Sequence, residues 1–366
     1  MTAVATAVRP ERLGTGARLY RIGVIRGDGT GPEVVAEALE VLEAVRDGFD
    51  VELVDFDLGA DRYLRTGETL PDGDLETMRG LDAILLGAVG DPRVPPGILE
   101  RDLLLRIRFE LDQYVGLRPV IRFPGVQTLV PSHAEADVDM VVIRENSEGL
   151  YSGVGGFLRK GTRHEVAAQS SVNTRHGVER IVRYAFDLAM RPGRRRHVTL
   201  VHKTNVLTFA GDLYQRVVNE ISREYPYVTT DYVHVDAACI YFLEQPSRFD
   251  VIVTDNMFGD IITDLGAMIQ GGMGIAAGGN INPSGVSMFE PIGGTAPSET
   301  GKGTINPLAA IGATGMLLAQ LGEERAAARI DAGIRFACTK LASMRAGEMG
   351  YSTREVGALV REAAAI

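Results

Sequence analysis

The stretch YRIGVIRGDGTGPEVVAEALEVLEAV (Tyr20–Val45) indicates the fold class, because it changes from one periodicity to another. A short apolar run, Tyr20–Ile25, leads into a Gly-rich turn and then into apolar residues at helical spacing. The glycines stand at positions 27, 29 and 31, which is not the GxGxxG spacing of the common dinucleotide-binding turn. The stretch therefore predicts a strand, a tight turn and a helix outside an ordinary Rossmann fold.

The same alternation continues along the chain. Further apolar runs predict strands over five ranges: Leu81–Gly90, Val138–Glu145, His197–Lys203, Tyr227–Asp236 and Phe249–Asn256. Helical spacing occurs between them in LLLRIRFELDQY, GVERIVRYAFDLAM, LYQRVVNEISREY and FGDIITDLGAMI. Strands that alternate with helices indicate an α/β protein with helices flanking a sheet. The longest irregular stretch is Gly271–Pro307, and a segment of this kind is often functional.

Composition narrows the class of protein. The 366 residues are 45% hydrophobic and 23% charged, which is typical of a globular chain with room for two domains. The net charge of −10 shows no basic footprint of a nucleic-acid binder. No apolar run reaches the ~18 residues of a membrane span, and the first twenty residues lack the apolar core of a secretory signal. We expect these first residues to form a disordered leader. Because the chain has only two cysteines, Cys239 and Cys338, we expect it to be cytoplasmic.

Two aspartates in FGDIITDLG suggest a metal site. Asp260 and Asp264 are four residues apart on a predicted helix, so their carboxylates lie on one face. A third aspartate, Asp236, ends the preceding predicted strand. Oxygen ligands of this kind suit Mg²⁺ or Mn²⁺. The alternative is a solvated acidic face, which the apolar neighbours make less favourable.

Arginine and lysine supply a second set of candidates. Arg108, Arg118 and Arg144 flank apolar segments, and guanidinium groups bind carboxylates in a bidentate manner, although ordinary surface arginines are the alternative. Lysine occurs only at four positions, 160, 203, 302 and 340. Lys203 ends a predicted strand and is a candidate base, because lysine can lose its proton where arginine cannot. Tyr151 is a candidate proton donor.

Taken together, the motifs resemble those of the isocitrate/isopropylmalate dehydrogenases, a family of β-decarboxylating enzymes. The similar segments are GDGTGPEV, RFELDQYVGLRP, VVIRENSEGLY, HKTNVL, FGDIITDLG and FEPIGGTAPSETGKGTINP. They occur in the family's order and cover nearly the whole chain. The segment ERDLLLRIRF (Glu100–Phe109) is most similar to the isopropylmalate branch.

The resemblance implies a two-domain α/β fold. A discontinuous nucleotide-binding domain would comprise residues 1–113 and 271–366, and a second domain would comprise 114–270. An arm near 151–170 would take part in an obligate homodimer, in which a lysine and an aspartate reach the partner's site. The active site would lie in the cleft between the domains.

The resemblance also implies roles for individual residues. The catalytic residues would be Tyr151, Lys203 and Asp236. The metal ligands would be Asp236, Asp260 and Asp264. Residues that contact the substrate would be Leu104, Leu105, Arg108, Arg118, Arg144, Asn205 and Val206. The nucleotide loop would use Glu290, Gly294, Thr295, Ala296, Ser298, Glu299 and Asn306.

Departures from the family pattern bear on specificity. Asp102 and Leu104 stand where isocitrate enzymes carry Ser and Asn. Leu104 and Leu105 would offer an apolar wall, which favours an isopropyl group over a third carboxylate. Ser298 replaces the aspartate expected at the adenosine ribose, and Glu299 follows it; a 2′-phosphate would be repelled there, which favours NAD over NADP. Gly293 replaces a histidine, and Arg26 replaces a proline for a reason that the sequence does not reveal.

These features predict the metal-dependent oxidative decarboxylation of 3-isopropylmalate to 4-methyl-2-oxopentanoate, with reduction of NAD, in leucine biosynthesis. The alternatives are a tartrate or D-malate dehydrogenase, or a paralogue acting on another 2-hydroxy acid. One missing methylene changes specificity by only ~1–3 kcal/mol, so small substrates are not excluded. A non-catalytic regulatory subunit is the alternative from another class, but the chain retains the catalytic residues. We expect neither nucleic acid nor a membrane as a partner.

Overall fold

A computed structural model describes residues 11–12, 18–128, 130 and 138–365. The chain divides into two compact units. The first comprises residues 1–113, 121–135 and 267–366, and the second comprises 114–120 and 136–266. Among the described residues, none of the helices has the length and apolar character needed to span a membrane.

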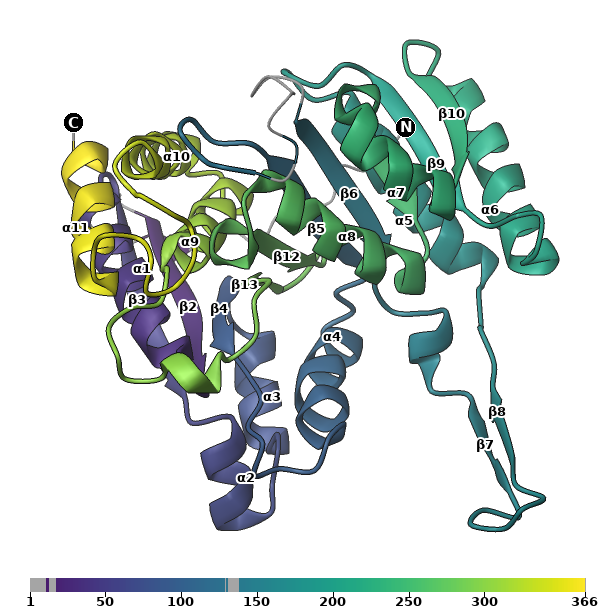
Figure 1. Cartoon of the computed structure of the whole chain (residues 1–366), viewed down its shortest axis with the longest axis horizontal. Helices are drawn as coiled ribbons and strands as arrows, with labels where there is room; N and C mark the ends of the chain where they lie inside the picture. The colour runs from purple at the N-terminus through teal and green to yellow at the C-terminus, as the bar shows by residue number, and fades with distance from the viewer. Residues whose placement is uncertain (1–10, 13–17, 129, 131–137, 366) are drawn as a thin grey trace. The chain divides into compact units, whose positions relative to one another are not determined.

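The first unit is built on a sheet of mainly parallel strands (Figure 1). Its strands are β1 (Glu11–Arg12), β2 (Arg18–Gly27), β3 (Phe49–Phe56), β4 (Ala83–Ala88), β12 (Ala277–Ile281) and β13 (Ser287–Pro291). Strand β2 pairs in parallel with β3 and β4, and β13 adds in parallel to β4. Strand β12 is antiparallel to β13. Segments from both ends of the sequence therefore share one sheet.

Helices pack on this sheet, because burying their apolar faces against it removes those faces from water. They are α1 (Gly31–Val45), α2 (Ala60–Thr66), α3 (Asp72–Arg79), the π-helix η1 (Glu100–Leu105), α4 (Arg106–Glu110), α9 (Leu308–Gln320), α10 (Glu324–Cys338) and α11 (Thr353–Ala364). Helix α1 packs against α9 and α11. A second apolar layer joins Ile84 of β4 to Met78 of α3, Leu103 of η1 and Ile107 of α4.

In the second unit the strands follow one another in the order β5 (Val115–Ile121), β6 (Asp139–Glu145), β11 (Val251–Thr254), β9 (His197–His202) and β10 (Thr229–His234). Of these, β6, β11, β9 and β10 pair in parallel. The helices are α5 (Arg175–Ala189), α6 (Thr208–Ile221), α7 (Val235–Glu244) and α8 (Asn256–Gln270). Strands β6, β9 and β11 are buried almost throughout, as continuous apolar runs predict.

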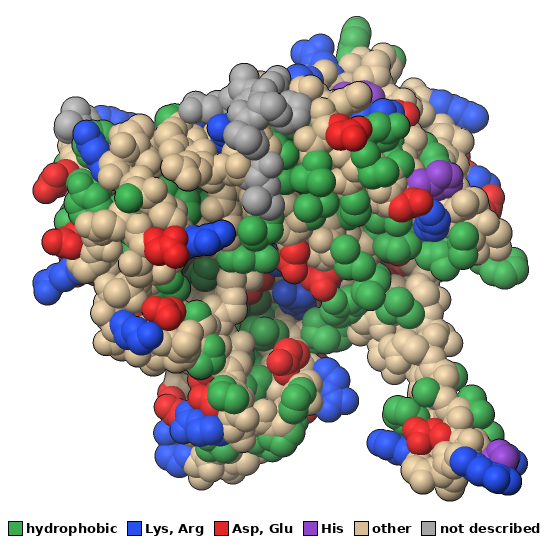
Figure 2. Space-filling view, viewed as in Figure 1, with side chains coloured by type: hydrophobic (Ala, Val, Ile, Leu, Met, Phe, Trp, Pro, Cys, Tyr) green, Lys and Arg blue, Asp and Glu red, His purple; other side chains and the backbone are tan. Residues whose placement is uncertain are grey.

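A two-stranded arm extends from the second unit (Figure 1). It consists of β7 (Gly155–Leu158) and β8 (Val166–Gln169), which pair antiparallel and are exposed at every position. Phe157 and Leu158 are 59% and 60% exposed. Figure 2 shows apolar and basic side chains together at the end of the arm. Large apolar side chains exposed in this way mark a surface that is suited to contact another protein.

Three expectations about local structure need correction. The strand expected over Tyr227–Asp236 is shorter, because β10 ends at His234 and Asp236 lies in the first turn of α7. The helix expected in LLLRIRFELDQY begins as the π-helix η1. The stretch Gly271–Pro307, expected to be irregular, contains the β12–β13 hairpin, whose buried pairs of residues outweigh its Gly-rich composition.

Candidate functional site

The carboxyl ends of β6, β9, β10 and β11 meet at one edge of the second unit's sheet, because these strands are parallel. Arg144 lies near the end of β6, and Lys203 follows β9 directly. Asp236 follows β10, and α8 begins two residues after β11 ends. In open α/β sheets this edge is where ligands bind. The topology thus collects most of the predicted catalytic and metal-binding residues of this unit.

The side chain of Arg144, on β6, is fixed by contacts with the first turn of α8. Its side chain is 3% exposed, and Nε and Nη2 both donate to Oδ1 of Asn256, at 3.0 and 2.7 Å. Nη1 forms an ion pair with Asp260. A Cβ at Gly259 would lie 2.6 Å from Cγ of Arg144, so this helical position must be glycine. Asn256 and Gly259 are site residues that the sequence did not reveal, because only the fold brings them to Arg144.

Tyr151 shares Asp260 with Arg144. Its hydroxyl donates to Oδ2 of Asp260 at 2.6 Å, and the guanidinium of Arg144 lies 5.0 Å from the centre of its ring. Burial, followed by the hydrogen bond to Asp260, raises the pKa of Tyr151 above its usual value. The hydroxyl therefore keeps its proton at neutral pH and can act as a proton donor.

Asp260 and Asp264 lie on one face of α8, as their spacing predicts. Burial, and then the like charge of Asp260, raise the pKa of Asp264, while Arg118 and Arg144 oppose that shift. Arg118, on β5, is 5% exposed. Two carboxylates that repel one another fit a hard divalent cation, which would relieve the repulsion.

Asp236 is the third aspartate predicted as a metal ligand. In the described part of the structure, no group of three His, Cys, Asp or Glu side chains is arranged to hold a metal ion. Asp236 instead accepts a hydrogen bond from Lys203, with Nζ 2.6 Å from Oδ1. This contact, followed by the amide at the start of α7, lowers the pKa of Asp236. Asn205 and Val206 are exposed in the turn that follows Lys203.

In the first unit, the turn between β2 and α1 supports the predicted nucleotide loop. The backbone N–H and Oγ1 of Thr30 both donate to the carbonyl oxygen of Thr295, at 2.9 and 3.1 Å. Gly29 has φ +58, and a Cβ there would lie 2.3 Å from the same oxygen. Ala296 is left-handed, with φ +39, so the loop is strained at the next residue. Gly294 is exposed beside it.

Two further residues of the first unit are paired. Glu290, on β13, accepts a hydrogen bond from Asn280 at 2.9 Å and lies 3.6 Å from Nη2 of Arg108. Leu104 and Leu105, in η1, are partly buried, and Leu104 packs against the apolar layer that contains Ile107. Arg108, predicted to contact the substrate, therefore forms an ion pair with Glu290, predicted to belong to the nucleotide loop.

Glu299 is the acidic group of the loop that follows. Its Oε2 accepts a hydrogen bond from Oγ1 of Thr304 at 3.0 Å, and Lys302 Nζ lies 3.4 Å from Oε1. The bond from Thr304 is the main reason that the pKa of Glu299 is lowered. Oγ of Ser298 lies 3.4 Å from Oε1 of Glu299. The loop thus carries a fixed negative charge.

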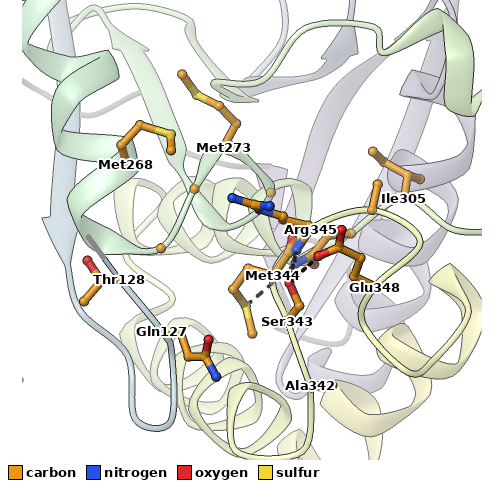
Figure 3. Close-up of a pocket in the computed structure, with 15 residues that line it drawn as sticks. Gln127, Thr128, Met268, Met273, Ile305, Ala342, Ser343, Met344, Arg345 and Glu348 are labelled. Carbon is orange, nitrogen blue, oxygen red and sulfur yellow. Dashed lines mark hydrogen bonds between the residues drawn. The ribbon is translucent and has the colours of Figure 1, made fainter. Parts of the chain in front are cut away.

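A cavity of about 830 Å³ lies within the first unit (Figure 3). Figure 3 shows Met268 and Met273 on one side, with Met344 and Arg345 across from them. Asn306, the predicted nucleotide residue, lines the cavity, and its Nδ2 donates to the carbonyl oxygen of Met344 at 3.1 Å. Met344 is more than seventy residues from Met268 and Met273 in sequence, so sequence reasoning did not bring these methionines together.

Arg26 now has a structural explanation. Its Nε lies 3.0 Å from Oδ1 of Asp55, which stands on the neighbouring strand β3 opposite Val24. Both side chains are exposed, so this ion pair contributes little to stability.

Comparison with known proteins gives consistent matches over most of the chain. A model of the isocitrate/isopropylmalate dehydrogenase family matches residues 21–360. A 3-isopropylmalate dehydrogenase of Thermobifida fusca is 58% identical over 323 residues, which cover 87% of this chain and 91% of the relative. One of Frankia casuarinae is 56% identical and covers 92% and 97%. The structure of an isocitrate dehydrogenase from Methylococcus capsulatus matches with a TM-score of 0.86 and 36% identity, over 95% of this chain and all of that one.

Proposed function

Because this chain belongs to the isocitrate/isopropylmalate dehydrogenase family, we propose that it oxidatively decarboxylates 3-isopropylmalate to 4-methyl-2-oxopentanoate and reduces NAD, as a step of leucine biosynthesis. The family match confirms the resemblance of the motifs and the expected fold class. The chain is an enzyme, a decarboxylating dehydrogenase. The observation that carries the substrate is the 56–58% identity to relatives named 3-isopropylmalate dehydrogenase over 87–92% of the chain.

The substrate class follows from the charges and the apolar surface. Guanidinium groups of Arg108, Arg118 and Arg144 would bind the two carboxylates of an alkylmalate, and Arg144 is already fixed in place by Asn256. Leu104 would contact the isopropyl group. An additional carboxylate at that place would lose its hydration without gaining a partner, which argues against isocitrate and homoisocitrate.

The proton transfers would use Lys203, which is paired with Asp236, and Tyr151, which is paired with Asp260. Lys203 would accept the proton of the C2 hydroxyl and can pass it to Asp236, whose oxygen lies 2.6 Å away. Tyr151 would return a proton to C3 after CO₂ has left, since its hydroxyl is protonated at neutral pH. When bound, NAD supplies the acceptor of the C2 hydride, and Mg²⁺ or Mn²⁺ held by Asp260 and Asp264 supplies a Lewis acid.

We also propose an obligate homodimer with shared active sites. Asp236 does not join Asp260 and Asp264 among the described residues of one chain, so a second copy would supply it together with Lys203. The exposed apolar arm supports such an assembly. Cys239 and Cys338 are both free thiols, which fits the reducing cytoplasm that we propose as the location.

The preference for NAD would rest on Glu299. Thr304 holds its carboxylate in place, where it can accept hydrogen bonds from the ribose hydroxyls and would repel a 2′-phosphate. The nearby cavity that Asn306 and Met273 line would take the adenine ring, because thioether groups make favourable contacts with aromatic rings. Substituting Glu299→Gln should raise the KM for NAD and narrow the difference between NAD and NADP.

A spectrophotometric assay at 340 nm tests the proposal. We would offer NAD or NADP with Mg²⁺ or Mn²⁺, and 3-isopropylmalate, D-malate, tartrate, isocitrate and homoisocitrate in turn. We expect kcat/KM to be highest with NAD and 3-isopropylmalate. Lys203→Met should abolish turnover. Lys340→Met should not, because Lys340 lies in the turn after α10 and its ammonium group packs on the ring of Phe336. Preference for D-malate or tartrate would overturn the substrate, and a folded dimer inactive on the whole panel would overturn the proposed reaction.

A further inference from the structure

The hydroxyl of Tyr232 forms hydrogen bonds that join the turn after Lys203 to the neighbouring strand, β10. Tyr232 lies on β10, and its oxygen accepts hydrogen bonds from the backbone N–H and the Oγ1 of Thr204, at 3.0 and 2.9 Å. The same oxygen lies 2.8 Å from Nδ1 of His234 and 3.3 Å from the carbonyl oxygen of His202. One hydroxyl therefore connects the end of β9 to the end of β10.

This network lies next to the proposed proton-transfer pair. Strands β9 and β10 are parallel, and His202 stands directly opposite His234. Lys203 is the next residue after β9, while Asp236 lies two residues beyond His234, in the first turn of α7. The contact between Lys203 and Asp236 thus depends on the relative position of two strand ends, which the Tyr232 hydroxyl joins.

Thr204 is held from a second direction by α6. A Cβ on Gly211 would lie 2.6 Å from Cα of Thr204, so the helix approaches the turn as closely as a glycine allows. The carbonyl oxygen of Lys203 accepts hydrogen bonds from the N–H groups of Val206 and Leu207, at 3.1 and 2.8 Å. The backbone of the turn is therefore tightly defined, although the lysine side chain itself is long and flexible.

We propose that Tyr232 is a positioning residue for the reaction, whose hydroxyl keeps the Lys203 turn in register with the start of α7. This inference rests on the proposed function. Proton transfer is sensitive to displacements of about 1 Å, so a small shift of the turn should slow it. Loss of the hydroxyl would remove this acceptor of the Thr204 N–H. Because an unsatisfied N–H is costly, the turn would shift so that the N–H can form another hydrogen bond.

The test removes only the hydroxyl. Tyr232→Phe keeps the ring and its edge-to-face contact with His234, at 5.1 Å between centroids. The matched control is Tyr227→Phe, which removes a hydroxyl from a side chain that is 70% exposed. We would measure kcat and KM with 3-isopropylmalate, NAD and Mg²⁺, and the primary isotope effect on kcat with substrate deuterated at C2.

For Tyr232→Phe we expect kcat to fall about tenfold while the KM for NAD changes less than about twofold. The isotope effect on kcat should increase, because a misplaced base slows the step in which hydride leaves C2 and makes that step limit turnover. Tyr227→Phe should match the wild type. Thr204→Val, which removes one of the two donors to Tyr232, should shift kcat and the isotope effect in the same direction by a smaller amount.

The outcomes separate this inference from the function on which it rests. An unchanged kcat and isotope effect in Tyr232→Phe would overturn it. A lower kcat with an unchanged isotope effect would also overturn it, since that pattern reflects fewer active molecules, as a lowered melting temperature would confirm. If the wild type turns over a different 2-hydroxy acid, the same comparison is made with that substrate. If no substrate of the panel is turned over, the proposed function fails, and this inference fails with it.

Discussion

His202 and Asp255 form a buried pair, and we expect their effects on the pH dependence of folding to cancel. His202 is 0% exposed, and its ring centroid lies 4.9 Å from that of Tyr214 and 5.6 Å from that of Phe258. Its Nε2 lies 3.7 Å from Oδ2 of Asp255, which is itself 6% exposed. Neither group can be solvated in its charged form, so folding changes the pKa of each.

Burial lowers the pKa of His202 from 6.5 to about 4. Between those values the unfolded chain binds a proton that the folded chain does not, so stability falls as the pH falls. At about 1.4 kcal/mol per pKa unit, the loss is about 3 kcal/mol. Burial raises the pKa of Asp255 from 3.8 to about 6, so the folded chain holds an extra proton over nearly the same range. Its contribution to stability therefore rises by about 3 kcal/mol as the pH falls.

Replacing either residue alone should therefore give a free energy of unfolding that changes with pH, with opposite signs in the two variants. Relative to the wild type, His202→Gln should gain up to about 3 kcal/mol of stability between pH 7.5 and pH 4, because only the Asp255 contribution remains. Asp255→Asn should lose a similar amount over the same range. Glu145, whose pKa is also raised by burial, is unchanged in both variants and contributes to both slopes alike.

Urea unfolding followed by far-ultraviolet circular dichroism measures these slopes. The protein concentration must be the same at every pH, since assembly changes apparent stability. The absolute stability of either variant at pH 7.5 does not enter the comparison. Slopes of the same sign in the two variants, or slopes equal to that of the wild type, would refute the reasoning that burial controls both groups.

Three further substitutions probe other parts of the structure. Gly29→Ala should lower the melting temperature by about 4 °C or more and raise the KM for NAD, because the new Cβ would lie 2.3 Å from the carbonyl oxygen of Thr295. Arg144→Lys should raise the KM for 3-isopropylmalate at least about tenfold, since lysine cannot reproduce the two hydrogen bonds to Asn256. Asp264→Asn should raise the Mn²⁺ concentration that gives half-maximal activity about tenfold, without lowering the melting temperature, because it removes one of two neighbouring like charges.

Each of these has a clear contrary result. A wild-type melting temperature for Gly29→Ala would show that the loop at Thr295 moves freely. A wild-type KM for Arg144→Lys would remove Arg144 from the substrate site. An unchanged Mn²⁺ requirement for Asp264→Asn, also measured by calorimetric titration, would remove Asp264 from the metal site.

The local pattern of the sequence predicts those features that depend on periodicity. The run Leu81–Gly90 contains β4, which is buried at every position, and the expected helix around Asp260 and Asp264 is α8. Their placement on one helix face follows from spacing alone. The roles of the site residues stay predictions that the kinetic experiments above would test.

Features that depend on long-range contacts could not be predicted in this way. Asn256 and Gly259 matter because Arg144 packs on them from a strand more than a hundred residues earlier. The cavity that Met273 and Met344 line forms only when segments distant in sequence come together. The shift of Asp236 from strand to helix reflects the start of α7, which no capping side chain signals in the sequence.

The shared sheet of the first unit also affects how the protein can be made on the ribosome. Strand β4 is synthesised early, but its parallel neighbour β13 follows about two hundred residues later. Until then, one edge of β4 remains open on the nascent chain, and the helices that cover α1 do not yet exist. An open, fully apolar strand is prone to pair with other chains. Most of the second unit is synthesised in this interval, so the time needed to translate it sets how long this edge of β4 remains without its partner strand.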